Sequence, residues 1–172
     1  MADPKIDYSQ KKRMLSIKAS DPSLLLEKLA GTEAVSQPFE FKLNLLSALD
    51  SVDLKALLRT PATVSLYLPD GSERYFNGLF RTVAQSREGE GEETERETSG
   101  VSNPARELTV YQGVLVPKFW FLTLDFNCRI FQNKTVPDIV EKVLQENGVT
   151  DFQFRAPLRD TSRYPERDYC VQ

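Results

Sequence analysis

The side chains that most often carry enzyme chemistry are scarce in this chain. Its 172 residues include two cysteines and no histidine. The absence of histidine excludes Ser-His and Cys-His nucleophilic pairs, histidine-ligated metals and a histidine proton switch. Two cysteines alone cannot build a usual zinc site. The sequence therefore predicts no catalytic residue, no cofactor-binding residue, no metal ligand and no cofactor.

Carboxylates are the remaining candidates for acid–base chemistry, which usually needs two of them in a defined frame. Asp125, Glu141 and Asp151 would meet this need only if the fold brought them into one cleft. The sequence contains neither a GxGxxG motif nor a Walker phosphate-binding loop. An enzyme would therefore depend on a cleft formed by these carboxylates.

An acidic segment interrupts the chain at residues 87–98. It contains six glutamates and two glycines, and it has no large apolar side chain. Such a segment cannot bury enough apolar surface to offset the entropy of ordering it, and its spacing matches no EF-hand calcium loop. We therefore predict a mobile surface loop over residues 86–104, in place of a calcium site or a site for a basic partner.

The overall charge argues against nucleic acid as a partner. The net charge is −3 and the isoelectric point is near 5.2, which gives no attraction to nucleic acid or to anionic membranes. No apolar run approaches the length of a membrane span, and residues 1–20 lack the apolar core of a secretory signal peptide. The arginines in residues 155–168 alternate with acidic residues, which indicates solvated charge and not a phosphate site. We interpret Cys128 and Cys170 as free buried thiols of a cytoplasmic protein, with a disulfide as the alternative.

Alternating apolar and polar residues predict a series of β-strands that would position any site. The predicted strands are residues 14–18, 39–45, 62–68, 72–85 and 108–116. Residues 69–71 predict a hairpin turn, and Gly78 predicts a bulge. The last two strands should pair across the acidic loop.

Three segments between the strands have weaker patterns. Residues 24–29 predict a loop or a turn of helix, and residues 31–33 predict a turn. Residues 51–59 predict a short helix capped by Ser51. In the last strand, one face is expected to be shared by Leu108, Val110, Val114 and Val116.

The densest aromatic run lies between Phe119 and Phe131 and includes Trp120. We expect these side chains to form core, because so short a chain needs most of its large apolar side chains there. A role as interface anchors is the alternative.

A well-marked helix follows over residues 135–147. Thr135 and Asp138 predict a capping box at its start, and Asn147-Gly148 predicts its end. Asp138 and Lys142 are spaced to form an ion pair. The apolar face expected to be buried consists of Val136, Ile139, Val140, Val143 and Leu144.

The C-terminal part of the sequence predicts two more short strands, at residues 151–155 and 169–171. The second is apolar and has no evident partner left in the sequence. We therefore expect the chain to be a fragment of a longer protein.

These elements predict a fold that is mainly β with a few helices (α+β), namely a small antiparallel β-barrel and a helical connecting region. We divide the chain into a disordered N-terminal extension at residues 1–12, a first β-barrel domain at residues 13–117, and the start of a second, connecting domain at residues 118–172.

Several of these stretches together resemble the N-terminal region of the VgrG family, the spike proteins of type VI secretion systems. The most specific stretch is CRIFQNKTVPDIV at residues 128–140, preceded by PKFWFLTL at residues 117–124. The other matching stretches are residues 31–33, 39–45, 57–69, 75–78 and 169–172. The resemblance covers residues 13–172 and departs from the family at the acidic segment.

The resemblance implies a structural part of a contractile machine, with a barrel of the phage tail hub type and no enzymatic activity. It implies that the chain is the N-terminal fragment of a trimeric hub, which docks on the tail tube and delivers effectors by contraction. The implied partners are further copies in a homotrimer, the hexameric tail-tube protein and baseplate proteins, with effectors and a PAAR-type tip bound through missing C-terminal parts. The implied location is the bacterial cytoplasm during assembly, followed by secretion, or translocation into a target cell, without a signal peptide.

Two other functions are compatible with the same residues. One is the hub of a phage tail or of an extracellular contractile particle. The other, from a different class, is a soluble β-barrel that binds a small ligand. An enclosed apolar pocket with a few polar groups would favour the ligand-binding barrel.

Overall fold

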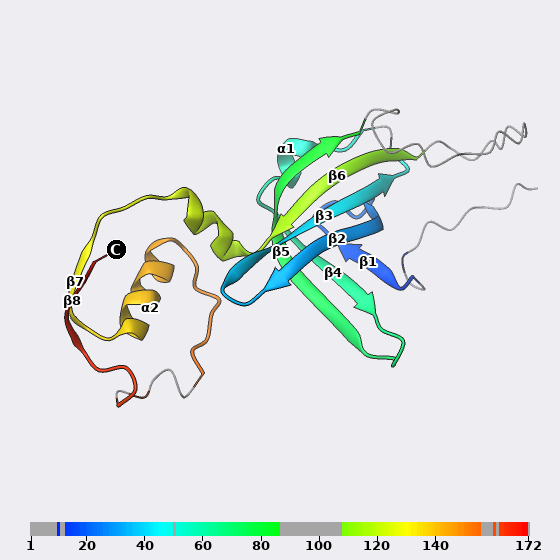
Figure 1. The fold of residues 1–172 in the computed structure, drawn as a ribbon. Coiled ribbons are helices and arrows are strands. Elements are labelled where there is room, and N and C mark those ends of the chain that lie inside the picture. Colours follow the sequence, from blue (N-terminus) through cyan, green and yellow to red (C-terminus); the bar gives the residue numbers. More distant parts are fainter. Residues whose placement is uncertain are drawn as a thin grey trace, which may run out of the picture. The chain divides into compact units, whose positions relative to one another are not determined.

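The structure is a computed structural model that describes residues 10, 13–49, 51–86, 108–155, 160 and 162–171. The chain forms two compact units, Met1–Pro117 and Lys118–Gln172, which are called unit 1 and unit 2 below (Figure 1). Apart from Gln10, the predicted extension at residues 1–12 lies outside the described residues. The predicted mobile loop at residues 86–104 also lies outside them, apart from Ser86.

Unit 1 is built on one six-stranded antiparallel sheet. Its strands are β1 (Leu15–Lys18), β2 (Leu25–Ala34), β3 (Gln37–Ser47), β4 (Pro61–Tyr67), β5 (Glu73–Gln85) and β6 (Thr109–Val116). Their order across the sheet is β1-β4-β5-β6-β3-β2. The prediction of a mainly β fold with a few helices is therefore confirmed, as is the pairing of β5 with β6 across the acidic segment.

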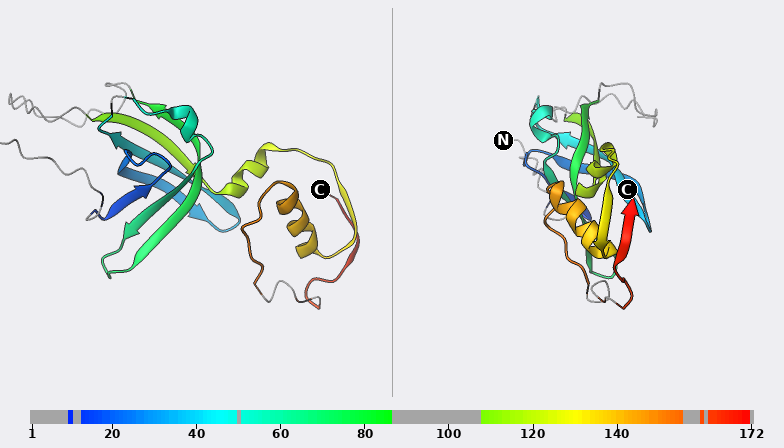
Figure 2. Two further views of the ribbon diagram at one scale, coloured as in Figure 1. Left: turned by 180° about the vertical axis from the view of Figure 1, so that it is seen from behind. Right: turned by 90° about the vertical axis from the view of Figure 1, so that its left-hand side faces the viewer.

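The sheet curls until its two edge strands, β1 and β2, contact each other (Figure 2). Strand twist produces such curling, and register shifts in the β2–β3 and β5–β6 ladders increase it. The apolar face points inward and forms the core. That core includes Ile17, Leu24, Leu26, Phe41, Leu43, Leu45, Val64, Phe76, Phe80, Tyr111 and Leu115.

β2 shows the clearest failure of the sequence prediction. Leu25–Ala34 is one long strand paired with β3, so the loop predicted at residues 24–29 and the turn predicted at residues 31–33 are both wrong. The turn lies instead at Val35 and Ser36, where Ser36 has a φ of 64°. Pairing with β3 decided the conformation of a segment whose own pattern was ambiguous.

Two glycines allow neighbouring strands to approach closely. A Cβ atom at Gly31 would lie 2.3 Å from the carbonyl oxygen of Glu40, and one at Gly78 would lie 2.5 Å from that of Val116. The bulge predicted at Gly78 is wrong, because the β4–β5 ladder is regular there and the register shift of β5 falls at Arg81. Glycine in a strand can mark a close backbone approach as readily as a bulge.

The buried side chains of β6 include Tyr111 and Leu115, with Gly113 between them. The prediction that the first three apolar residues of this strand face the core is therefore wrong, although Val116 is buried. Those three residues, which are only partly buried, are Leu108, Val110 and Val114. Gly113 has no side chain, so the sequence did not show which alternate residues of β6 point inward. An error of one residue in this assignment moves every side chain to the other face of the strand. The ring of Phe80 packs over Gly113.

The short helix α1 (Leu54–Leu57) follows β3. Asp53 caps it by accepting hydrogen bonds from the N–H groups of Lys55 and Ala56, both at 3.0 Å. The prediction of Ser51 as the cap is therefore wrong. Leu57 is buried and fixes the helix against the core.

Unit 2 contains the 3-10 helix η1 (Lys118–Leu124), β7 (Ile130–Lys134), α2 (Val136–Glu146) and β8 (Arg167–Val171). β7 and β8 pair as an antiparallel two-stranded ribbon. β8 therefore has a partner, contrary to the expectation for residues 169–171. Residues 151–155 form no strand, so that prediction is wrong.

The helix α2 begins and ends as predicted. The Thr135–Asp138 capping box is present, and Gly148 follows the helix with a φ of 71°. The predicted partner of Lys142 is wrong, because its Nζ lies 3.7 Å from a carboxylate oxygen of Glu146. Within the described residues, no helix has the length and apolar content that crossing a membrane requires.

Candidate docking surfaces

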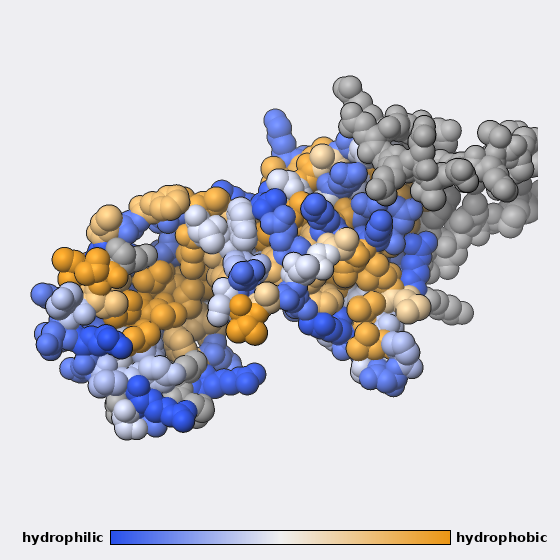
Figure 3. Space-filling view, viewed as in Figure 1, coloured by the Kyte–Doolittle hydropathy of each residue, from blue (hydrophilic) through white to orange (hydrophobic). Residues whose placement is uncertain are grey.

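Unit 2 contains an open apolar groove of about 340 Å³ between α2 and the β7–β8 ribbon. Leu122 of η1 contributes to its wall. The other lining residues are Phe131, Ile139, Val140, Val143, Leu144, Cys170 and Val171. Apolar residues gather on this part of the surface (Figure 3). The groove thus offers apolar contact area with very few polar groups.

The groove exists because the apolar face of α2 has too little to pack against. Four of its five predicted core residues line the groove, and none of the helix's residues is buried. The predicted burial of that face is therefore wrong in this structure. A two-stranded ribbon is too small to cover an amphipathic helix.

Phe131 anchors one wall of the groove and is only 5% exposed. The Arg129 guanidinium lies 5.5 Å from the centre of its ring, and Lys142 Nζ lies 6.0 Å from it. Both cations pair with Glu146. The network holds α2 beside β7 through cation–π contacts and ion pairs.

The opposite face of the β7–β8 ribbon is also apolar. Phe131 and Cys170 are register partners, so strand alternation places Ile130 and Tyr169 on the other face. Each of these two side chains is 68% exposed. Both faces of the ribbon therefore carry apolar side chains, a pattern typical of strands that are covered on both sides.

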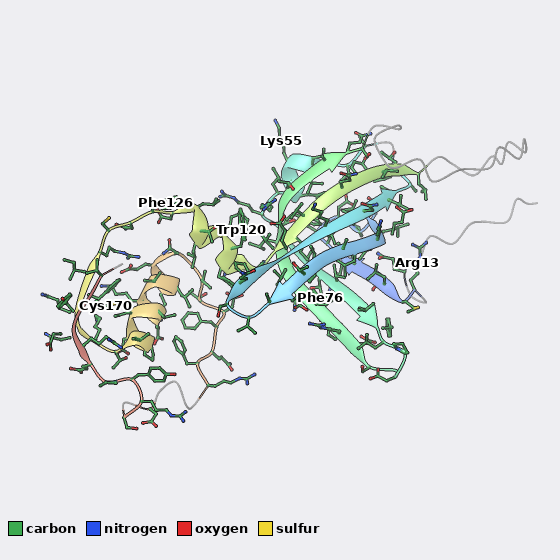
Figure 4. The ribbon with its side chains drawn as sticks, in the orientation of Figure 1. Arg13, Lys55, Phe76, Trp120, Phe126 and Cys170 are labelled. Carbon is green, nitrogen blue, oxygen red and sulfur yellow. The ribbon has the colours of Figure 1, made fainter. Side chains whose placement is uncertain are left out.

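The aromatic run between residues 119 and 131 is largely exposed, so its prediction as core is wrong except for Phe131. Trp120 is half-buried and stacks edge-to-face on Phe121, with 5.3 Å between ring centres. Phe126, between η1 and β7, is 93% exposed (Figure 4). Their exposure favours the alternative interpretation, in which these side chains are interface anchors.

The carboxylates considered for acid–base chemistry have separate local roles. Asp151 accepts a hydrogen bond from Lys118 Nζ at 3.0 Å, and this contact lowers the pKa of Asp151. Glu141 accepts one from Gln145 at 3.1 Å, and Asp125 is exposed. No group of three metal-ligating side chains within the described residues could hold an ion. None of these three carboxylates lines the apolar groove of unit 2.

A hydrogen-bonded cluster of Glu73, Tyr67 and Tyr75 lies on the β4–β5 hairpin of unit 1. The Tyr75 hydroxyl donates to Glu73, and hydrogen bonds from Tyr75 and Tyr67 lower the pKa of Glu73. The same contacts raise the pKa of both tyrosines. The pKa of each of these three groups is thus shifted further from pH 7, which makes none of them a suitable general acid or base at that pH.

The two cysteines and the described arginines of residues 155–168 are exposed or half-buried. Cys128 and Cys170 are both free, as predicted, but Cys128 is exposed and Cys170 is half-buried, so their prediction as buried thiols is wrong. Arg155, Arg163 and Arg167 are exposed, which agrees with solvated charge.

Neither β7 nor the exposure of Ile130 and Tyr169 was predicted from the sequence. IFQNK has two apolar residues followed by three polar ones, so it shows no strand alternation, and its pairing with β8 could not be predicted from local pattern. Exposure cannot be read from residue type, since the same apolar residues serve in cores and in interfaces.

Comparison with known proteins gives a matching family model and a solved structure with a similar fold. The family model described as "Phage tail baseplate hub (GPD)" matches residues 32–172. The E. coli c3393 protein has a similar fold, with a TM-score of 0.60 and 21% sequence identity over 91% of this chain and 38% of its own. It is described as a component of the type VI secretion system with structural similarity to the T4 bacteriophage tail proteins gp27 and gp5.

Two curated relatives from Pseudomonas aeruginosa (strain PAO1) confirm the resemblance to VgrG. The type VI secretion system spike protein VgrG1c is 35% identical over 167 residues, which cover 96% of this chain and 20% of that protein. VgrG1b is 36% identical over 149 residues, covering 87% of this chain and 17% of its own length. The chain thus spans about a fifth of the length of these relatives. Because the hub model matches most of its residues, the chain belongs to the phage tail baseplate hub (GPD) family.

Proposed function

We propose that this chain is a structural component of the type VI secretion spike, namely the N-terminal part of a trimeric hub that docks on the tail tube and delivers effectors by contraction. The observation that carries this proposal is its similarity to VgrG spike proteins over almost its whole length. Membership in the tail hub family supports the same role.

In this proposal the chain binds its partners through the shape and the apolar area of its exposed surfaces. The groove of unit 2, the second face of the ribbon and Phe126 provide exposed apolar side chains. Large side chains of this kind are typical anchors of protein interfaces. The hexameric tail-tube protein, baseplate proteins and further copies of the chain are the proposed partners.

The proposed role includes no catalytic turnover. The lowered pKa values of Glu73 and Asp151 leave these carboxylates ionised and poorly suited to acid–base exchange at neutral pH. Assembly in the bacterial cytoplasm and later translocation with the spike complete the proposal.

The proposal is tested by binding of the purified chain to purified hexameric tail-tube protein of a type VI system, measured by sedimentation velocity. The parent chain should bind. Phe126→Ser should weaken binding about tenfold with an unchanged free energy of unfolding, because an exposed anchor contributes to the interface and not to the core. Thr150→Ser, at an exposed position of unit 2 outside the groove and the ribbon, is the control. No binding by the parent chain would refute tube docking.

The alternative function, the hub of a phage tail, has less support, because the relatives that match over almost the whole chain are type VI spike proteins. The same experiment with a phage tail-tube protein separates the two. Tighter binding to the phage protein than to the type VI protein would select the phage hub.

A further inference from the structure

The curled sheet of unit 1 has a seam where its two ends meet. β1 and β2 are the edge strands of the sheet, and among the described strands no ladder joins them. The two strands nevertheless contact each other. Main-chain groups that face such a seam need other partners, because burying them unpaired is costly.

The side chain of Gln10 lies in the seam and bonds to both edges. Its Nε2 donates to the carbonyl oxygen of Ile17 at 3.0 Å and to that of Leu24 at 3.1 Å. Its Oε1 accepts from the N–H of Ile17 at 2.8 Å and from the N–H of Leu26 at 3.4 Å. One side-chain amide therefore satisfies four main-chain groups, two on Ile17 of β1, one on Leu26 of β2 and one on Leu24 just before β2.

The register of β1 explains why Ile17 is the residue that needs this partner. Ile17 lies opposite Val64 in the antiparallel β1–β4 ladder. In such a ladder both main-chain groups of a residue point to the same side, and the side alternates along the strand. Since both groups of Ile17 bond to Gln10, those of Ser16 and Lys18 point toward β4.

The chemistry of the side chain fits the seam. A glutamine amide has two donor hydrogens and an acceptor oxygen, which is the hydrogen-bonding pattern of the peptide groups in a neighbouring strand. The three residues that it contacts, Ile17, Leu24 and Leu26, are buried members of the core. Opening the seam would expose these side chains together with their main-chain groups.

We propose that Gln10 is a clasp that closes the curled sheet of unit 1, by replacing the missing β1–β2 ladder with one side-chain amide. The clasp makes Gln10 part of the barrel wall and fixes the position of the short edge strand β1. Without it, the edges of β1 and β2 separate locally while the rest of the sheet stays paired.

The test is amide hydrogen exchange, measured by NMR on the full chain. Gln10→Met keeps the length of the side chain and removes its hydrogen bonds. The Ile17 amide should then exchange about tenfold faster or more, as expected from the loss of a hydrogen bond of ordinary net strength. The Lys18 amide, which faces β4, should change less than twofold. Gln85→Met, at an exposed position of β5, is the matched control and should leave Ile17 unchanged.

An Ile17 exchange rate within twofold of the parent would overturn the proposal, and so would equal acceleration at Ile17 and Lys18. A second measurement applies if Gln10→Met does not fold. In the parent chain, the side-chain amide protons of Gln10 should exchange about tenfold slower than those of Gln85, since both hydrogens are bonded. Equal rates would overturn the clasp.

Discussion

Tyr111 places a phenol group in the core of unit 1. The residue is 1% exposed, and its hydroxyl has no hydrogen-bond partner within the described part of the chain. An unsatisfied buried hydroxyl carries a desolvation penalty, while the ring itself contributes apolar burial. The ring and the hydroxyl of this residue therefore act on stability in opposite directions.

Replacing Tyr111 by Phe should raise the free energy of unfolding by about 1 kcal/mol, because it removes only the unpaired hydroxyl. Urea denaturation measures the change. Tyr111→Leu is the control, and it should lower the free energy of unfolding by about 2 kcal/mol through the space it leaves. A loss of stability in Tyr111→Phe would show that the hydroxyl has a partner after all.

The capping box of α2 makes the helix sensitive to pH. The hydroxyl of Thr135 donates to Asp138 at 2.6 Å, and this contact, followed by the Thr135 N–H, lowers the pKa of Asp138. A carboxyl whose pKa is lower in the folded state stabilises that state above its unfolded pKa, near 4. The contribution is lost as the pH falls through the lowered pKa.

We therefore expect the helical ¹³Cα shifts of α2 to weaken at acidic pH and to follow the titration of Asp138. Asp138→Asn should weaken α2 at pH 7 and remove this pH dependence, whereas the parent and the variant should become alike once Asp138 is protonated. An NMR titration of both proteins checks this. A parent helix that is insensitive to pH would contradict the role of the ionised carboxylate.

At the scale of elements, the sequence was informative where a pattern was long and local. β3 and α2 follow from clean alternation and from a capping box, both of which depend on neighbours in sequence. β2 could not be predicted because its conformation depends on pairing with β3. The phase of β6 was lost because Gly113 carries no side chain to mark the inner face.

The docking surfaces were less predictable than the strands. The aromatic residues around Trp120 are evident in the sequence, but their exposure is not, because it depends on how much apolar surface the rest of unit 2 can cover. The clasp at Gln10 could not be found either, because nothing in a sequence shows which distant main-chain groups a single amide will meet.

The close approach of β5 to β6 at Gly78 leaves no room for a side chain at that position. Gly78→Ala should lower the free energy of unfolding by about 3 kcal/mol, since the new Cβ would meet main-chain atoms of Val116 that cannot move alone. Gly113→Ala is the matched control on the partner strand. Its Cβ would lie 3.1 Å from the Phe80 ring, so a loss of about 1 kcal/mol is expected.

Chemical denaturation of both variants measures these changes. Equal losses at Gly78 and Gly113 would show that contact with the main chain is not the deciding factor.

At the scale of the whole molecule, the two units differ in how much apolar surface they bury. The buried core residues of the described chain belong to unit 1, except for Phe131 and Val149 in unit 2. Local stability follows the number of buried apolar contacts. Unit 2 should therefore open at a lower free energy than unit 1 when the chain is alone.

Native-state hydrogen exchange tests this difference. The amides of α2 should exchange about a hundredfold faster than those of β3, after correction for intrinsic rates. The amides of β6, also central in the sheet, serve as the control and should match β3. Equal protection of α2 and β3 would mean that the two units unfold together.

The β7–β8 ribbon carries apolar side chains on both faces, and among the described residues no third strand pairs with either of its edges. This structure also has consequences for the cell that makes it. Such a ribbon is a template for uncontrolled strand addition, so newly synthesised copies risk aggregation that grows with their concentration. Assembly with the partners therefore has to be faster than aggregation of the free chain. Synthesis alongside the partners, or protection by a chaperone, would keep the polypeptide usable until its apolar faces are covered.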